Sequence, residues 1–141
     1  MKRIISIQKE PKKMLKVANE IQDYIVANLP ELRGVYLESD EVKMNVPGVI
    51  IIHAGTQAQN RSGSELVGFS QHWHIDLTLP RYRIREQAGE LLASLVALLH
   101  RWKPESAIAD LMVDGVDGPL IESQYTNYRL KFSTAISVSL Q

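Results

Sequence analysis

The chain contains no cysteine. Its 141 residues therefore form no disulfide, offer no thiol nucleophile and bind no zinc through thiolates. A protein without disulfides suits a reducing compartment, so we expect this one to lie in the cytoplasm.

Net charge is also missing, because 16 basic and 16 acidic residues cancel. A balanced chain does not indicate a general binder of nucleic acid or of membrane surfaces. A local basic cluster remains near the N-terminus. Long apolar runs are lacking as well: Leu91–Leu99 is too short to span a bilayer, and Ile4–Ile7 is too short for a signal peptide. We expect no membrane contact.

Signatures of catalysis and of cofactor binding are absent too. The chain has no Gly-x-Ser-x-Gly elbow and no Walker or dinucleotide-binding glycine pattern. Asp114, Asp117 and Glu122 lack the ligand spacing of an EF-hand, and the Asp-Gly steps at 114–118 are more typical of a turn. These absences predict no catalytic residues and no cofactor.

Two long segments alternate between apolar and polar residues, which is typical of strands with one buried face. In residues 128–140, Tyr128, Leu130, Phe132, Thr134, Ile136, Val138 and Leu140 alternate with Arg129, Lys131, Ser133, Ala135, Ser137 and Ser139. Residues 66–79 repeat the pattern, and only Gln71 interrupts the apolar side. Both segments predict a half-solvated sheet.

Apolar residues at helical spacing predict two amphipathic helices, at 11–29 and 84–102. Shorter strands are predicted at 33–38, 108–113 and 120–124, and a central strand buried on both faces at 49–52. Residues 54–65 read as a long polar loop. This order predicts one α+β domain over residues 1–141, with a mostly antiparallel mixed sheet and both helices on one face. Residues 1–10 are expected to form an arm or an added strand.

Three polar residues on one strand are the sharpest candidates for chemistry. His72, His74 and Asp76 share a face because side chains alternate along a strand. They could supply part of a zinc or iron site, with His53 as a further ligand if its strand is adjacent. The simpler interpretation is the solvated side of an amphipathic strand, which we favour; a small metal-dependent enzyme stays as the alternative.

A compact basic cluster follows the same strand. Arg81, Arg83 and Arg85 surround Tyr82 at the junction with the second helix. They could contact phosphate or an acidic partner surface, or they could form a solvated corner and pair with Glu86 or Glu90.

The order of elements resembles a known family. An HWHIDLTL strand leads into a helix that ends LVALLHRW, and the chain finishes with the strand YRLKFSTAISVSL. In this order, over residues 14–140, the chain is similar to the tail terminator (minor tail) proteins of long-tailed phages and prophages. The resemblance implies a structural protein, not an enzyme, that forms a hexameric ring, caps the tail tube and joins it to the head.

The resemblance also implies partners and a location. The partners would be other copies of the chain, the tail tube protein and a head-completion protein, while DNA passes through the lumen unread. The location would be the host cytoplasm during assembly and then the virion tail. The candidate interface residues are Gly55, Thr56, Gln57, Gln59, Asn60, Arg61 and Ser62, followed by Arg81, Arg83 and Arg85. An adaptor module of a larger bacterial complex is a further alternative.

Overall fold

The computed structural model describes residues 16–38, 40, 44–58, 66–81 and 84–139. Within these ranges a first helix occupies residues 16–28. The later elements are β1 (Gly34–Leu37), β2 (Gly48–Ala58), β3 (Leu66–Pro80), α2 (Ile84–Leu99), β4 (Met112–Ile121) and β5 (Tyr125–Ser139). The predicted arm at residues 1–10 lies outside the described residues.

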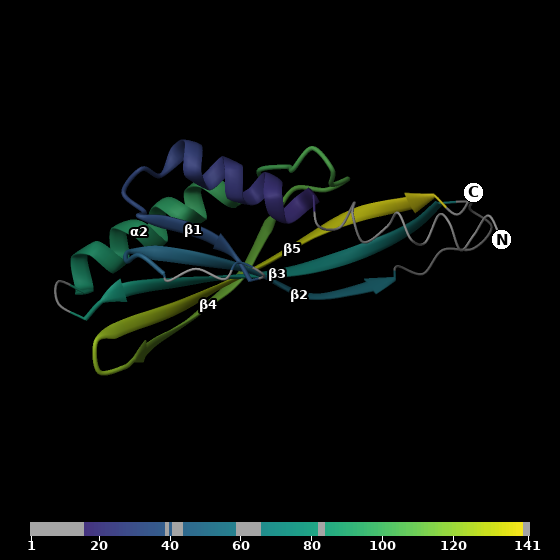
Figure 1. Cartoon of the computed structure of the whole chain (residues 1–141). Helices are drawn as coiled ribbons and strands as arrows, with labels where there is room; N and C mark the ends of the chain where they lie inside the picture. Colours follow the sequence, from purple (N-terminus) through teal and green to yellow (C-terminus); the bar gives the residue numbers. More distant parts are fainter. Residues whose placement is uncertain (1–15, 39, 41–43, 59–65, 82–83, 140–141) are drawn as a thin grey trace.

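The strands form one mixed sheet in the order β1-β2-β3-β5-β4 (Figure 1). β1 runs parallel to β2, and all other neighbours are antiparallel. Both helices lie on the same side of the sheet. The predicted α+β class is therefore confirmed. No helix in the described part of the chain is long and apolar enough to cross a membrane.

The core lies between the helices and one face of β3 and β5. The register places Trp73 beside Phe132 and Ile75 beside Leu130, and all four side chains are buried. The helices contribute two buried stripes, namely Val17, Ile21, Ile25 and Leu29, and Ala88, Leu91, Leu95 and Leu99. Each buried side chain of leucine or isoleucine size contributes about 1.5–3 kcal/mol. The apolar faces predicted for β3, β5 and both helices thus meet in one core.

The second helix ends three residues before the predicted position. α2 stops at Leu99, and Arg101 adopts a left-handed backbone with a φ of 68°. The Arg101 N–H donates to the Leu111 carbonyl at 2.7 Å. Trp102 therefore leaves the helix and stacks on Tyr24, with ring centroids 4.0 Å apart.

The prediction of a central strand buried on both faces at 49–52 is wrong in its burial and in its exact place in the sheet. β3 is the central strand, and β2 lies between it and the edge strand β1. Val49 and Ile51 are buried, whereas Ile50 and Ile52 are half-buried. A run of β-branched residues fits a strand with either one or two covered faces, so its composition alone does not fix its place in the sheet.

The predicted loop at 54–65 is wrong over its first part, because β2 continues to Ala58. A shift in pairing between His53 and Gly55 bends the strand at this point. Gly55 has a φ of +147°, which only glycine adopts readily. Small polar residues here mark an irregular strand, and residues 59–65 lie outside the described part.

The predicted turn at 114–118 is also wrong. β4 is one strand from Met112 to Ile121, and the chain reverses at residues 122–124 instead. Two register shifts, at Val113/Gly115 and at Asp117/Leu120, absorb the Asp-Gly steps as bulges. Two short strands were expected where one irregular edge strand exists.

Candidate interaction surface

The sheet face opposite the helices carries a polar band from three strands. The register aligns Asp76 of β3 with Arg129 of β5, and Arg129 with Asp117 of β4. In the next row, His74 is aligned with Lys131. Neither described helix lies on this side (Figure 1), so the band is open to solvent or to a partner.

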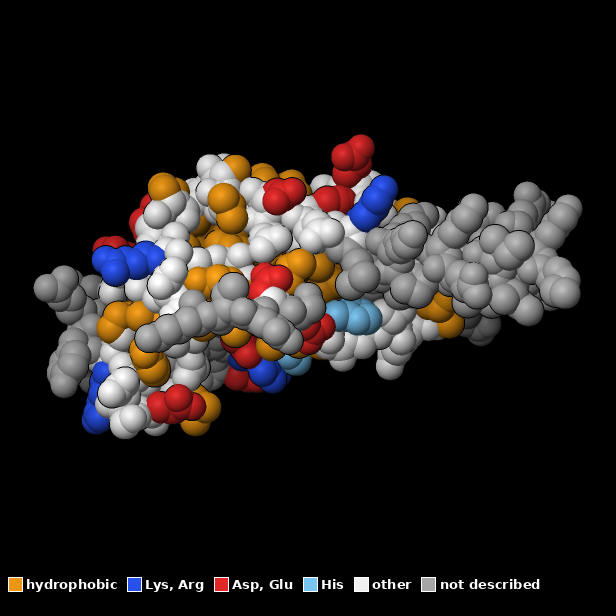
Figure 2. All heavy atoms as spheres, in the orientation of Figure 1, with side chains coloured by type: hydrophobic (Ala, Val, Ile, Leu, Met, Phe, Trp, Pro, Cys, Tyr) orange, Lys and Arg blue, Asp and Glu red, His pale blue; other side chains and the backbone are white. Residues whose placement is uncertain are grey.

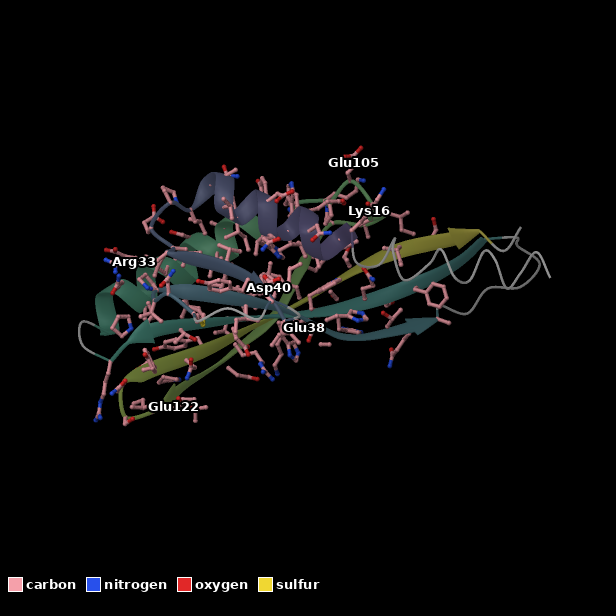
Figure 3. All side chains as sticks on the ribbon, viewed as in Figure 1. Lys16, Arg33, Glu38, Asp40, Glu105 and Glu122 are labelled. Atoms are coloured by element: carbon pink, nitrogen blue, oxygen red, sulfur yellow. The ribbon has the colours of Figure 1, made fainter. Side chains whose placement is uncertain are left out.

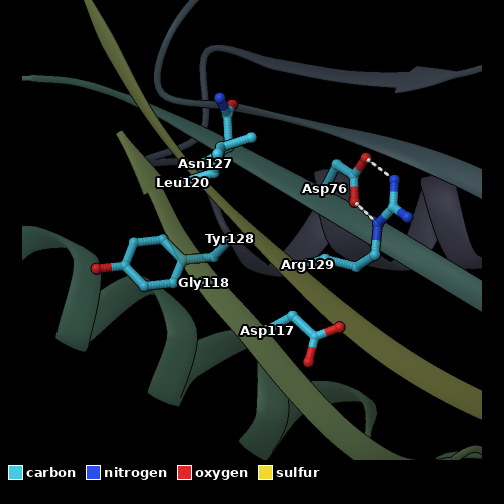
Figure 4. Close-up of a pocket in the computed structure, with 7 residues that line it drawn as sticks. All are labelled: Asp76, Asp117, Gly118, Leu120, Asn127, Tyr128 and Arg129. Atoms are coloured by element: carbon cyan, nitrogen blue, oxygen red, sulfur yellow. Dashed lines mark hydrogen bonds and ion pairs between the residues drawn. The ribbon is translucent and has the colours of Figure 1, made fainter. Parts of the chain in front are cut away.

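Two ion pairs connect the band. The Arg129 Nε and Nη2 atoms donate to the two Asp76 carboxylate oxygens at 2.8 and 2.9 Å (Figure 4). Lys131 Nζ lies 2.7 Å from Asp117 Oδ2. All four side chains are partly exposed, and such surface pairs contribute about 1 kcal/mol or less each. Their main effect is to hold β3, β5 and β4 in register with their charges matched.

A shallow hollow adjoins the ion pairs on this face. Its volume is about 320 Å³, and it is lined by Asp76, Asp117, Gly118, Leu120, Asn127, Tyr128 and Arg129 (Figure 4). At Gly118 the φ is +123°, and an added Cβ would lie 2.9 Å from the Asn127 carbonyl oxygen. Glycine thus permits the close approach of β4 to β5 that shapes the hollow.

The surroundings of His74 disfavour its charged form. Partial burial lowers the pKa of His74, and the positive charges of Arg129 and Lys131 lower it further, against the opposing effect of Asp76 and Asp117. Conversely, the hydrogen bond to Asp76 raises the pKa of Arg129. Burial and the two neighbouring positive charges thus favour the neutral form of His74 near pH 7.

We expect an Arg129→Gln substitution to raise the pKa of His74, because it removes a positive charge and frees Asp76. In the wild-type chain, His74 binds its proton more tightly in the unfolded state, where its pKa is about 6.5, than in the folded state. The His74 contribution to the free energy of unfolding therefore declines as the pH falls through about 6.5 towards the lower folded-state pKa. An NMR titration measures the pKa of His74 in the wild type and in Arg129→Gln, and a His74→Gln variant assigns the His74 signal. An unchanged or lower pKa in Arg129→Gln would contradict the charge argument.

The three candidate metal ligands do share one face of β3, as predicted, but they do not form a site. Asp76 is held by both nitrogens of its arginine partner. His53 lies opposite Trp73, on the helix side of the sheet, and the centroids of the two rings are 4.9 Å apart. It therefore cannot join His72 and His74 on the open face. No group of three or more potential ligands gathers anywhere in the described residues.

The predicted interface residues that the structure describes fall at two separate places along β3, one near its middle and one after its end. Gly55, Thr56 and Gln57 belong to β2 and pair with His72, Gln71 and Ser70. Gln59, Asn60, Arg61 and Ser62 lie outside the described residues.

Arg81 directly follows the last residue of β3, about 30 Å along the strand from His72. Its N–H donates to the Gln124 carbonyl at 3.0 Å and its Nη1 to the Ser123 carbonyl at 3.3 Å. Arg81 thus holds the β4–β5 turn. Arg83 and the Arg85 side chain lie outside the described part.

The most apolar exposed surface was not predicted. Seven large apolar side chains are exposed among the described residues, and six of them lie between residues 108 and 125: Ile108, Met112, Val116, Leu120, Ile121 and Tyr125. We call this surface, together with its interleaved acidic residues, the β4 strip. Figure 2 shows apolar side chains beside acidic ones at this end of the sheet, and Figure 3 places Glu122 at the hairpin tip. Apolar residues alternating with acids, with no base from 104 to 128, were the available signal.

Comparison with known proteins supports the fold alone. No family model matches the chain, and no curated protein matches it. Among solved structures, 32 chains match. One of them, which carries a sequence label in place of a functional name, aligns with a TM-score of 0.57 over 84% of this chain and 88% of that chain, at 12% identity. A likeness at this identity shows a shared architecture and carries no activity or partner.

Proposed function

We propose that the chain is a structural assembly subunit without a catalytic role. In this proposal it resembles the tail terminators of long-tailed phages: copies form a ring that caps the tail tube and joins it to the head. Its partners are then further copies of itself, the tube protein and a head-completion protein.

One observation carries the proposal: exposed apolar surface is concentrated on one sheet edge. Leu120 and Ile121 are 62% and 59% exposed. β4 is also the last strand of the sheet in the described residues, so its outer side has no strand partner. Contiguous apolar patches mark interaction sites, and unpaired sheet edges favour pairing between chains.

The metal-dependent alternative has less support. A carboxylate that accepts two hydrogen bonds from one guanidinium has few lone pairs left for an ion. The two neighbouring imidazoles alone are too few for a catalytic zinc site, which takes three protein ligands.

The oligomeric state of the purified chain tests the proposal. Size-exclusion chromatography with light scattering should show a multimer that grows with concentration, and negative-stain electron microscopy should show rings with a central opening. A Leu120→Gln/Ile121→Gln variant should lose this association, because both side chains are exposed and their replacement leaves the core intact.

The matched control is Val26→Gln, which changes a 58% exposed apolar residue on the first helix, away from β4. This control should still form rings. A wild-type chain that stays monomeric at its highest soluble concentration, or a strip variant that assembles normally, would contradict the proposal.

A further inference from the structure

The β4 strip is strongly acidic. Between residues 108 and 125 the chain contains no lysine or arginine but four acids: Asp110, Asp114, Asp117 and Glu122. All four are exposed. An edge that combines apolar and acidic side chains suits a partner segment that combines apolar and basic ones.

Most of this negative charge is not neutralised by the chain's own bases. Only Asp117 forms an ion pair within the described residues, with Lys131. Asp114 Oδ1 accepts a hydrogen bond from the Ser133 hydroxyl at 3.3 Å, which leaves its charge uncompensated. The carboxylates of Asp110 and Glu122 have no cationic partner in the described part.

The complementary composition occurs in the same chain. Residues 1–16 contain six bases, Lys2, Arg3, Lys9, Lys12, Lys13 and Lys16, against the single acid Glu10. The balance is therefore +6 − 1 = +5, against −4 for residues 108–125. Ile4, Ile5 and Ile7 add apolar side chains between the two groups of bases.

We propose that the β4 strip binds the basic N-terminal segment, residues 1–16, of a second copy of this chain. The isoleucines cover the exposed apolar side chains of the strip, and the lysines meet its free carboxylates. The outer edge of β4 offers backbone N–H and C=O groups to an added strand. This inference rests on the proposed function, because it supplies the contact between neighbouring subunits.

The segment is assigned to a second copy because the proposed function needs a contact between neighbouring subunits. Lys16 lies beside Glu105 at the start of the first helix, while Glu122 lies at the far hairpin tip (Figure 3). Each copy therefore carries one basic segment and one acidic strip at different places. Such a contact is head-to-tail, and head-to-tail contacts close into rings when the rotation allows.

Two charge-reversed variants test the contact. The first is Asp114→Lys/Glu122→Lys in the strip, and the second is Lys9→Glu/Lys12→Glu/Lys13→Glu in the segment. Each alone should associate at least about tenfold more weakly than wild type, because like charges then meet across the contact. Mixing the two variants should restore association, since the acidic segment of one copy then meets the basic strip of the other. Light scattering at a fixed total concentration measures all four samples.

An Asp23→Lys/Glu31→Lys variant is the matched control for the strip variant, because it also reverses two exposed acids but lies outside the strip, in the N-terminal region. It should associate as wild type does. Thermal unfolding checks that every variant folds.

Four results would overturn the proposal. Unchanged association in either reversed variant means that the strip and segment do not meet. A single variant can also carry all five reversals, two in the strip and three in the segment. If that variant associates normally while the mixture of the two separate variants does not, each segment docks on its own chain. Rings that persist in both variants overturn this contact alone, whereas a monomeric wild type overturns the proposed function as well.

Discussion

A Trp73→Ala substitution is expected to lower the free energy of unfolding by about 3–5 kcal/mol, the range typical of deleting a buried aromatic side chain. Trp73 is 2% exposed in the centre of β3 and lies directly opposite Phe132 of β5. On its other side the His53 ring contacts it at 4.9 Å. Alanine would leave a cavity that these strand-bound neighbours cannot fill.

The indole N–H slightly reduces the expected loss. Trp73 Nε1 is buried and has no hydrogen-bond acceptor in the described structure, so its removal also removes a desolvation cost. This cost is about 1–3 kcal/mol for a buried polar group and does not offset the packing of a whole indole. Trp73→Phe isolates the effect, because it keeps a ring and removes the unpaired N–H.

Urea denaturation followed by circular dichroism measures the change, with Trp102→Ala as the control. Trp102 is half-buried and stacks on Tyr24 at the edge of the core, so the same chemical change should cost less there. Equal losses at the two tryptophans would show that Trp73 is not the centre of the core.

The central strands could be predicted from the sequence because each carries its own evidence. A two-residue period over β3 and β5 determines which side chains are buried, whatever the neighbours are. It also predicted that Gln71 lies among the buried residues, which the structure confirms. The helices were predicted for the same reason, with errors only at their ends.

β2 and β4 could not be predicted as fully, because their shape depends on pairing. Glycines at positions 55, 115 and 118 are typical of turns in isolation. Paired against regular strands, the same glycines produce bulges that keep the chain in the sheet. Nothing local in the sequence distinguishes a bulge from a turn, since the difference lies in hydrogen bonds to β3 and β5.

On the open face of the sheet, too, the sequence predicts which residues are solvated but not which of them pair. The sequence placed His74, Asp76, Arg129 and Lys131 on solvated faces of two strands. Which carboxylate meets which base follows only from the register of β3 on β5 and of β5 on β4. The β4 strip likewise depends on β4 being an edge strand, which is a property of the whole sheet.

The second large effect is a gain in stability. We expect Gln71→Met to raise the free energy of unfolding by at least about 2 kcal/mol, because a buried donor or acceptor without a partner costs about 1–3 kcal/mol. Gln71 is 0% exposed, and neither Oε1 nor Nε2 has a hydrogen-bond partner in the described structure. Methionine has a similar volume and adapts well to core packing.

The neighbours of Gln71 explain its isolation. Thr56 and Thr134 flank it on β2 and β5. The Thr134 hydroxyl donates to the Ala109 carbonyl at 2.6 Å, and the Thr56 hydroxyl lies 2.7 Å from His53 Nε2. Both flanking hydroxyls are thus engaged elsewhere, and neither polar atom of the Gln71 amide has a partner in the described structure.

Gln22→Met is the matched control for the same measurement. Gln22 Nε2 donates to the Val35 carbonyl at 2.8 Å, so this variant should lose about 0.5–1.5 kcal/mol. A gain in the free energy of unfolding for Gln71→Met, together with a loss for Gln22→Met, would show that Gln71 is retained at a cost to stability. Residues that break the local rules of a core in this way are concentrated at functional sites. A Gln71→Met variant that gains stability but no longer forms rings would therefore connect the amide to assembly, whereas a loss of stability would mean that the amide is hydrogen-bonded in solution.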